Sequence, residues 1–272
     1  NNFIINLVDY IDDSNDLWLI FEKGGKSLSN LLFKIKGEFM GNERIYCIKK
    51  GKLLIEFFNN IEVFKTFFKK MLQFIHFLNK NGIVHCDIKP DNILIEYDYD
   101  DNGTFILKSV KMIDFGSAFF INNPDNFSSN TPEYMCPEIN DLTEKNASMK
   151  DIITFLKGLK CYSWIIDIWS LGVTILEIIQ SCPLWMNYKA KVIINGKAIF
   201  KTGLFGVKGR NNLKIFTRQQ EVSNSVPKLV NESLVRNQND QELLTDLLSQ
   251  MLDFNYKSRI SPLLALQHDF FK

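Results

Sequence analysis

Residues 85–92 of this 272-residue chain read His85-Cys86-Asp87-Ile88-Lys89-Pro90-Asp91-Asn92. The stretch sets a carboxylate, an ammonium group and a carboxamide close together along the chain. Any one of these residues alone is more often a solvated or helix-capping residue than a catalyst. The interpretation of the stretch therefore depends on the motifs that accompany it.

Two further motifs follow in order. Asp114-Phe115-Gly116 comes after two predicted strands, and Pro132-Glu133-Tyr134-Met135-Cys136-Pro137-Glu138 comes next. A lone Asp-Phe-Gly would arise by chance, but the ordered set resembles the catalytic core of eukaryotic-type protein kinases. The resemblance covers the whole chain. It implies an α+β, protein-kinase-like fold with a mainly helical large lobe and a residual hairpin of the small lobe.

The resemblance assigns roles to five residues. Transfer of a γ-phosphoryl group depends on positioning and on neutralising the charge that develops. Asp87 is then expected to accept or orient the proton of the substrate hydroxyl, and Lys89 to contact the γ-phosphate and mark serine/threonine specificity. Asn92 and Asp114 would supply oxygen ligands for Mg²⁺. Thr131 matches the threonine that hydrogen-bonds the catalytic Asp and Lys.

The first apolar runs are similar to the end of a kinase small lobe. Phe21 would then be the gatekeeper, and the residues from Glu22 to Gly24 would be the hinge. The resemblance implies that ATP places its adenine against the Glu22 carbonyl, the Gly24 amide and an apolar floor at Leu94. The Gly24-Gly25 dipeptide alone is equally consistent with a plain turn.

Four more residues are expected to be structural. Asp167 lies on a nearly all-apolar helix, where a carboxylate must be hydrogen-bonded. The resemblance pairs it with His85 and makes it the anchor of the loop backbone. It also predicts a buried ion pair between Glu138 and Arg259.

Apolar periodicity predicts the main elements. Helical spacing indicates an amphipathic helix from Glu62 to Asn79 and a buried helix from about Ile165 to Gln180. The other elements expected are an antiparallel hairpin of 3–8 and 17–21, strands at 93–96 and 110–113 joined by an acidic loop, and helices at 241–252 and 261–267.

The domain interpretation follows from the resemblance. Residues 1–26 are expected to be the truncated end of a small lobe with the hinge, and residues 27–272 the large lobe. Surface insertions relative to the family are expected near 34–60, 97–104 and 140–162.

The family carries a Gly-rich loop, a strand Lys and a helix Glu ahead of the hairpin, and this sequence shows none of them. Gly203, Gly206 and Gly209 have the wrong spacing and position to replace that loop. We therefore expect the chain alone to turn over ATP weakly.

Cys86 departs from the commoner family pattern, which has an Arg that grips a phosphorylated activation loop. A thiol cannot do so. The His-Cys-Asp loop is similar to that of the dual-specificity tyrosine-regulated kinase group. We expect that phosphorylation of Ser128 or Ser129 would not switch activity through residue 86.

Composition narrows the partners. The net charge of +1 predicts no nucleic-acid or membrane binding, and the protein substrate is the expected partner. No apolar run is expected to reach the roughly 18 residues that span a bilayer, since the richest stretch, Leu171 to Ile179, carries Glu177 and follows Asp167. Five widely spaced cysteines without a C-x-x-C pair favour an intracellular setting, cytoplasmic or nuclear, over a disulfide framework or zinc site. The sequence gives no indication of oligomeric state.

Two functions remain open at this point. The first is a protein serine/threonine kinase that uses ATP and Mg²⁺, favoured because Asp87, Lys89, Asn92 and Asp114 are all present. The second is a pseudokinase-like scaffold or binding module, in which the absence of the Gly-rich loop is a genuine loss. A Gly-rich loop and strand Lys encoded upstream of Asn1 would decide for the enzyme.

Overall fold

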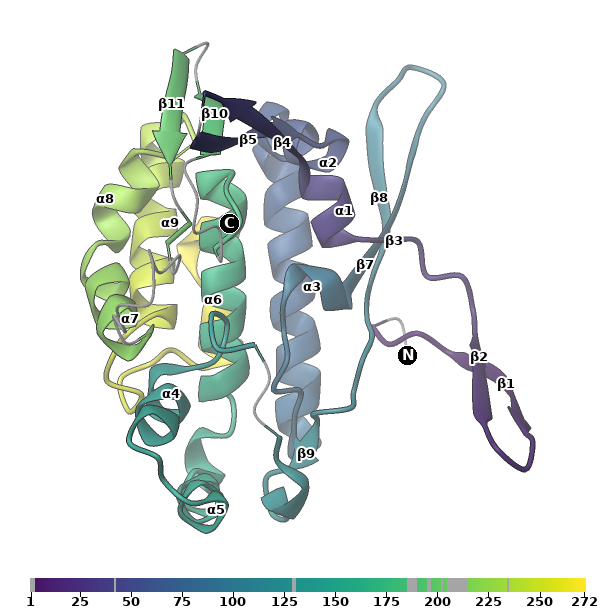
Figure 1. The fold of residues 1–272 in the computed structure, drawn as a ribbon. Coiled ribbons are helices and arrows are strands. Elements are labelled where there is room, and N and C mark those ends of the chain that lie inside the picture. Colours follow the sequence, from purple (N-terminus) through teal and green to yellow (C-terminus); the bar gives the residue numbers. More distant parts are fainter. Residues whose placement is uncertain are drawn as a thin grey trace.

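Two long helices lie side by side at the centre of the molecule, α3 (Ile61–Lys80) and α6 (Ile165–Gln180) (Figure 1). The computed structural model describes residues 3–41, 43–128, 131–184, 190–194, 197–201, 203–204, 215–233 and 235–272. Ser129, Gly206 and Gly209 lie outside these ranges. The helical core with small sheets at its edges confirms the predicted α+β class.

Helix α3 forms where periodicity predicts it. The Asn60 side chain caps it by accepting a hydrogen bond from the Glu62 amide at 3.1 Å. Its apolar stripe is buried, and Gly82 follows the helix with a φ of +66°. The fully buried aromatic side chains of this stripe are Phe64, Phe67, Phe68 and Phe74.

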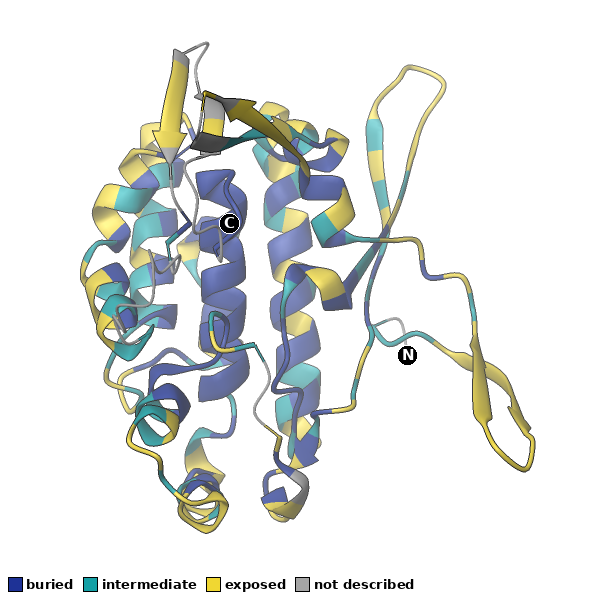
Figure 2. Ribbon diagram, viewed as in Figure 1, coloured by how far each residue is buried: buried dark blue, intermediate teal, exposed yellow. Residues whose placement is uncertain are grey.

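Helix α6 is buried along its whole length, as predicted (Figure 2). Thr174 donates to the Ser170 carbonyl within the helix at 2.8 Å, and the Ser170 hydroxyl lies 3.0 Å from the Ile166 carbonyl and 2.8 Å from the Tyr134 carbonyl outside the helix. The stretch Lys160–Gln180 is long and apolar enough to cross a bilayer, which corrects the sequence-based statement. Because 89% of that window is buried inside the protein, it has the burial of a core helix.

The remaining helices surround this pair. The predicted C-terminal helices are present as α9 and α10, and α9 lies close to α6 because Gly172 has no side chain. A Cβ there would lie 2.8 Å from a Leu252 methyl carbon. The helices are α1 (Leu28–Leu32), α2 (Lys52–Asn59), α4 (Pro137–Glu144), α5 (Met149–Gly158), α7 (Ile215–Asn224), α8 (Val226–Asn231), α9 (Gln238–Met251) and α10 (Pro262–Leu266).

A three-stranded sheet has the order β3-β7-β8, made of β3 (Lys26–Ser27), β7 (Ile93–Tyr99) and β8 (Phe105–Met112). Both long strands extend well beyond the predicted 93–96 and 110–113. The expected acidic loop near 97–104 is therefore shorter than predicted, because residues 97–99 belong to β7 and only residues 100–104 connect the two strands. The reason is cross-strand aromatic packing: Tyr97 stacks on Phe105 with centroids 5.1 Å apart, and the Tyr99 ring meets Phe105 edge-on at 5.7 Å.

The N-terminal hairpin consists of β1 (Leu7–Asp12) and β2 (Leu17–Phe21) and projects from the body (Figure 1). All residues of both strands are exposed. The predicted first strand at 3–8 begins too early, because Phe3 and Ile4 pack against the body. The Met112 amide donates to the Phe3 carbonyl at 2.8 Å, and Phe3 contacts the ring of Phe74.

A second, four-stranded sheet has the order β11-β10-β5-β4. We call it the accessory sheet. Its two hairpins come from distant parts of the chain, and β5 pairs with β10 in parallel. The hairpin 190–201 was not predicted. The strands are β4 (Phe33–Met40), β5 (Glu43–Lys50), β10 (Ala190–Ile194) and β11 (Lys197–Lys201).

The proposed surface insertion near 34–60 is wrong in its last part. Helix α2 buries Leu53, Leu54 and Phe57 completely, and Phe57 meets Phe67 of α3 at 5.2 Å between centroids. Near 140–162 the chain forms the end of α4 and the whole of α5. A reciprocal capping box between Ser148 and Asp151 begins α5.

Candidate active site

The carboxylate of Asp167 in α6 holds the loop that carries Asp87 by accepting hydrogen bonds from its backbone. The His85 amide donates to Asp167 Oδ2 and the Cys86 amide to Oδ1, each at 2.9 Å. Burial raises the pKa of the Asp167 carboxyl to about 6, although the two amides act in the opposite direction. The predicted anchoring of the loop backbone is present, and it runs through the amides rather than through the His85 ring.

The His85 ring links the loop to the segment before Asp114. Its Nε2 lies 3.2 Å from the Ile113 carbonyl, and its Nδ1 accepts a hydrogen bond from the Asp87 amide at 3.3 Å. Burial lowers the His85 pKa to about 4, so the ring is neutral near pH 7. A neutral ring with Nε2–H as donor and Nδ1 as acceptor satisfies both contacts.

Four of the predicted site residues come together in this loop. Lys89 Nζ lies 2.8 Å from Asp87 Oδ2 and donates to Thr131 Oγ1 at 2.8 Å. Thr131 Oγ1 donates to Asp87 Oδ1 at 3.3 Å. The Asn92 amide nitrogen donates to Asp87 Oδ2 at 2.8 Å and to the Asp87 carbonyl at 2.9 Å. These bonds fix the orientation of a carboxylate that is 5% exposed.

The two residues that flank Asp114, Ile113 and Phe115, contact the loop that carries Asp87. The Ile113 amide donates to the Asn92 carbonyl at 3.0 Å. Asp114 has a φ of +62°, unusual for a residue other than glycine, and its carboxylate is exposed. The Phe115 ring is held 4.8 Å from the His85 ring, measured between centroids. Packing of Phe115 thus directs the adjacent Asp114 carboxylate outward.

The donor set fits a hard cation such as Mg²⁺. Asn92 uses its amide nitrogen toward Asp87, so its side-chain oxygen faces no hydrogen-bond donor among the described residues. The exposed Asp114 carboxylate accepts only a 3.3 Å bond from the Gly116 amide within the described chain. No group of three or more His, Cys, Asp or Glu side chains that could hold a metal ion occurs among the described residues, at this site or elsewhere.

The segment from Glu22 to Gly24, which was predicted to be the hinge, is also held in place. The Glu22 carboxylate binds Lys111 of β8 and accepts hydrogen bonds from Asn6, and these contacts lower its pKa to about 2. Gly24 is buried, and a Cβ there would lie 2.6 Å from a Leu94 methyl carbon. The structure therefore brings Gly24 and Leu94 together, two of the residues expected to contact adenine.

The backbone at position 25 requires glycine, which the Gly24-Gly25 dipeptide alone did not show. Its φ is +102°, and a Cβ would lie 2.3 Å from the Ile95 carbonyl oxygen. Only glycine permits this approach of the hinge to β7. The dipeptide is therefore more than a surface turn.

Sequence reasoning missed one buried pair. Glu177 of α6 accepts a hydrogen bond from the Tyr134 hydroxyl, and the Tyr134 carbonyl accepts one from Ser170 at 2.8 Å. Burial raises the pKa of Glu177 to about 8. The signal was available, because Glu177 is a second carboxylate on the nearly all-apolar helix that pointed to Asp167.

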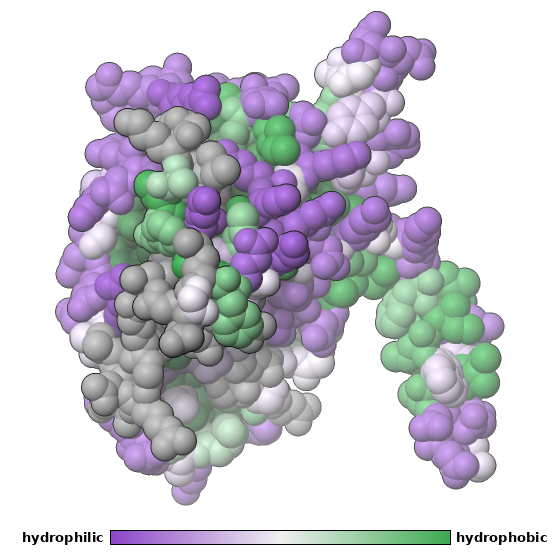
Figure 3. Space-filling model, turned by 45° about the horizontal axis from the view of Figure 1, so that its top comes forward, coloured by the Kyte–Doolittle hydropathy of each residue, from purple (hydrophilic) through white to green (hydrophobic). Residues whose placement is uncertain are grey.

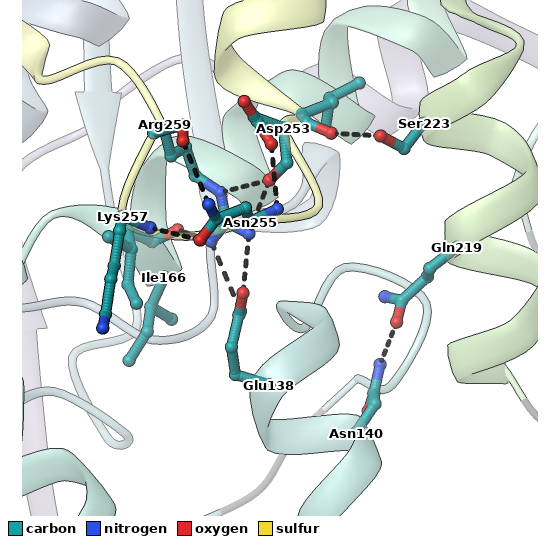
Figure 4. A network of polar contacts seen from close by, with 12 residues as sticks. Glu138, Asn140, Ile166, Gln219, Ser223, Asp253, Asn255, Lys257 and Arg259 are labelled. Carbon is teal, nitrogen blue, oxygen red and sulfur yellow. Dashed lines mark hydrogen bonds and ion pairs between the residues drawn. The ribbon is translucent and has the colours of Figure 1, made fainter.

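The predicted Glu138–Arg259 ion pair is present (Figure 4). Arg259 Nη2 lies 2.8 Å from Glu138 Oε1, and Nη1 lies 3.4 Å from Oε2. The same guanidinium donates to the Ile165 and Asp253 carbonyls at 2.9 and 3.0 Å. It stacks over the Trp169 ring at 5.0 Å. The pair joins α4, the N-terminus of α6 and the segment after α9.

Comparison with known proteins agrees with this architecture. The family model described as the protein kinase domain matches residues 1–271. A probable serine/threonine-protein kinase of Dictyostelium discoideum is 26% identical over 99% of this chain and 45% of its own length. A mitogen-activated protein kinase of Wallemia muriae is 26% identical over 98% of this chain and 79% of its own.

A probable serine/threonine-protein kinase of Plasmodium falciparum is 33% identical, over 53% of this chain and 25% of its own length. The chain thus spans less than half the length of the Dictyostelium and Plasmodium relatives.

Proposed function

Because this chain belongs to the protein kinase family, we propose that it carries the catalytic loop of a serine/threonine kinase that transfers the γ-phosphate of ATP to a protein hydroxyl. The observation that supports this most directly is the contact of Lys89 with both Asp87 and Thr131. A purely structural loop has no need to hold an ammonium and a carboxylate side by side at its mouth, with the Lys89 side chain 21% exposed.

The roles follow from the geometry. Asp87 orients the substrate hydroxyl and takes its proton, because Asn92 and Thr131 fix the orientation of its carboxylate. Lys89 balances negative charge on the transferred phosphoryl group. When bound, Mg²⁺ neutralises phosphate charge, and Asn92 and Asp114 are the residues that would hold it. Gly24 and Leu94 would hold the adenine.

Three finer proposals accompany this one. The Cys86 thiol supports a relation to the dual-specificity tyrosine-regulated group. The cysteine pattern supports an intracellular site of action. Residues 1–272 show no Gly-rich loop and no strand Lys to hold the α- and β-phosphates, so we propose that these residues alone turn over ATP weakly.

The test is phosphate transfer from labelled ATP to a generic basic protein in the presence of Mg²⁺, with the full-length protein. Asp87→Asn should lower the rate about 10²- to 10⁴-fold, the usual contribution of a positioned general base. Asp91→Asn, an exposed neighbour in the same loop, is the matched control and should stay close to wild type. Equal activity of Asp87→Asn and wild type would remove Asp87 from its role. A folded but inactive wild type would favour the pseudokinase-like scaffold.

A further inference from the structure

The accessory sheet carries four lysines on one face. Register places Lys34 of β4 directly opposite Lys49 of β5, and Lys36 opposite Cys47. The parallel pairing then sets Lys191 of β10 beside Cys47. Residues opposite one another in a sheet project from the same side, and so do alternate residues of one strand. Lys34, Lys36, Lys49 and Lys191 therefore share one face, which we call the lysine face.

The lysine face points to solvent. All four lysines are exposed. The other face packs on the body around Phe33 and Ile48, which are 9% and 4% exposed, whereas Phe39 further along β4 is 74% exposed. The sheet lies at the upper end of the molecule in Figure 1. In Figure 3, which tilts that end forward, hydrophilic residues predominate among the coloured atoms of the upper half.

The positive charge of this face is largely uncompensated. Lys36 pairs with Glu38 at 3.5 Å, with both side chains more than half exposed. No carboxylate pairs with Lys34, Lys49 or Lys191 in the part of the chain that the structure describes. Like charges directly opposite each other destabilise a sheet, and Lys34 and Lys49 form such a pair. Among the residues whose side chains the structure describes, the register places four lysines and one glutamate, Glu38, on this face, although the whole chain has a net charge of only +1.

We propose that the lysine face docks an acidic, extended segment of the protein substrate, an inference that rests on the proposed kinase function. Alternate residues of a strand lie roughly 6.6–7 Å apart. Lys34 and Lys36 therefore match carboxylates on alternate residues of an extended peptide. Lys49 and Lys191 widen the positive strip across the sheet, so the peptide's charge meets cations on three strands.

The position of the sheet suits a docking role. Strand β4 begins at Phe33, directly after α1, and α1 packs against the 3₁₀ turn Pro90–Asn92 that ends the catalytic loop. A substrate held by an acidic segment at the sheet has a raised effective concentration at Asp87. The face thus selects substrates by a segment that is distinct from the phosphorylated residue.

The described part of the face favours a polypeptide over a membrane or a nucleic acid. Phe200, paired with Lys191 across β10 and β11, is its one large exposed aromatic side chain within the described residues. Membrane adsorption requires a broad apolar face beside the cations, and single-stranded nucleic acid is bound by successive stacking aromatics.

The binding test uses a fluorescent Glu-Gly repeat peptide, a Gln-Gly repeat as uncharged probe, and the full-length protein. The variant Lys34→Gln/Lys49→Gln/Lys191→Gln should bind the acidic peptide about tenfold more weakly, because three exposed charge contacts are lost. The matched control Lys69→Gln/Lys150→Gln/Lys160→Gln has the same net charge and removes exposed lysines elsewhere. It should change affinity less than about twofold.

Equal loss in both variants would overturn the proposal, since the effect would then follow net charge. The proposal would also be overturned if wild type bound phosphatidylserine vesicles or polyuridylate RNA more tightly than the acidic peptide, and if the Lys34→Gln/Lys49→Gln/Lys191→Gln variant lost that binding.

A kinetic measurement separates docking from catalysis. The Lys34→Gln/Lys49→Gln/Lys191→Gln variant should have a raised KM for a serine peptide that carries the Glu-Gly tract. Its KM for the same peptide without the tract should equal that of wild type. Absence of phosphorylation of either peptide by wild type would count against the kinase function, and the binding data would then decide the docking alone.

Discussion

The Cys86 amide donates to Asp167 Oδ1 at 2.9 Å while Cys86 itself has a φ of +67°. A left-handed conformation costs a residue other than glycine about 1–3 kcal/mol. The bond to a buried carboxylate on α6 offsets this cost. The residue before Asp87 is thereby kept in a conformation that it would not adopt alone, and the direction of the Asp87 side chain depends on a residue 80 positions away.

Removal of this anchor should be costly. Asp167→Ala leaves the His85 and Cys86 amides buried without an acceptor, and each unsatisfied donor costs about 1–3 kcal/mol. We expect a loss of about 2–6 kcal/mol in the free energy of unfolding, measured by chemical denaturation. Thr174→Val is the matched control on α6, because its hydroxyl bonds only within the helix. An equal loss from Thr174→Val would show that the effect comes from helix α6 and not from the anchored loop.

The Glu138–Arg259 pair should contribute through its burial. Arg259→Met leaves the Glu138 carboxylate without its partner, and breaking a buried pair costs about 3–5 kcal/mol. The exposed pair of Lys157 and Asp125, 3.1 Å apart, is the comparison, and Lys157→Met should cost less than about 1 kcal/mol. In a double-mutant cycle with Glu138→Gln, additive losses would contradict direct coupling.

Glu177 should make stability depend on pH. Burial raises its pKa from 4.5 in the unfolded chain to about 8, so the folded state binds the proton more tightly. The contribution of this tighter proton binding to the free energy of unfolding is fully present below about pH 4.5 and is lost as pH rises through about 8. Between those values wild type should lose about 1.4 kcal/mol per pH unit relative to Glu177→Gln. Unfolding curves of both proteins at about pH 5.5 and about pH 7.5 test this. A difference that stays constant, or grows in favour of wild type as pH rises, would contradict it.

The segment that contains Ser128 and Ser129 should tolerate the loss of both hydroxyl groups. Burial raises the pKa of the Cys86 thiol, which is 2% exposed and carries no positive charge for a phosphate. Ser128→Ala/Ser129→Ala in the full-length protein should therefore keep its turnover within a few-fold of wild type. Ser128 is exposed and lies 3.4 Å from the Ser117 hydroxyl, a contact that costs little to remove. Steady-state phosphorylation rates are the measurement, and a drop of several orders of magnitude would refute the expectation.

Sequence alone determined the central helices. The apolar period of 3.6 residues located α3 and α6 to within one residue, because a helix face must be buried wherever it packs. Asp167 could be predicted to be hydrogen-bonded because a carboxylate on a nearly all-apolar helix needs donors, while its role as the anchor of the loop was implied by the family resemblance. Local patterns of this kind carry their own physical constraint.

Only the tertiary structure decided what meets across the chain. The accessory sheet joins strands from 33–50 and 190–201, and no local pattern in either segment specifies that partner. The longer β7–β8 hairpin depends on the match of Tyr97 with Phe105, and the left-handed φ of Cys86 depends on a bond from another helix. Sheet register and backbone strain are set by contacts distant in sequence, whereas helix periodicity is set by neighbours. For that reason the sequence identified the residues of the candidate site, and the fold determined their orientation and the lysine face beside them.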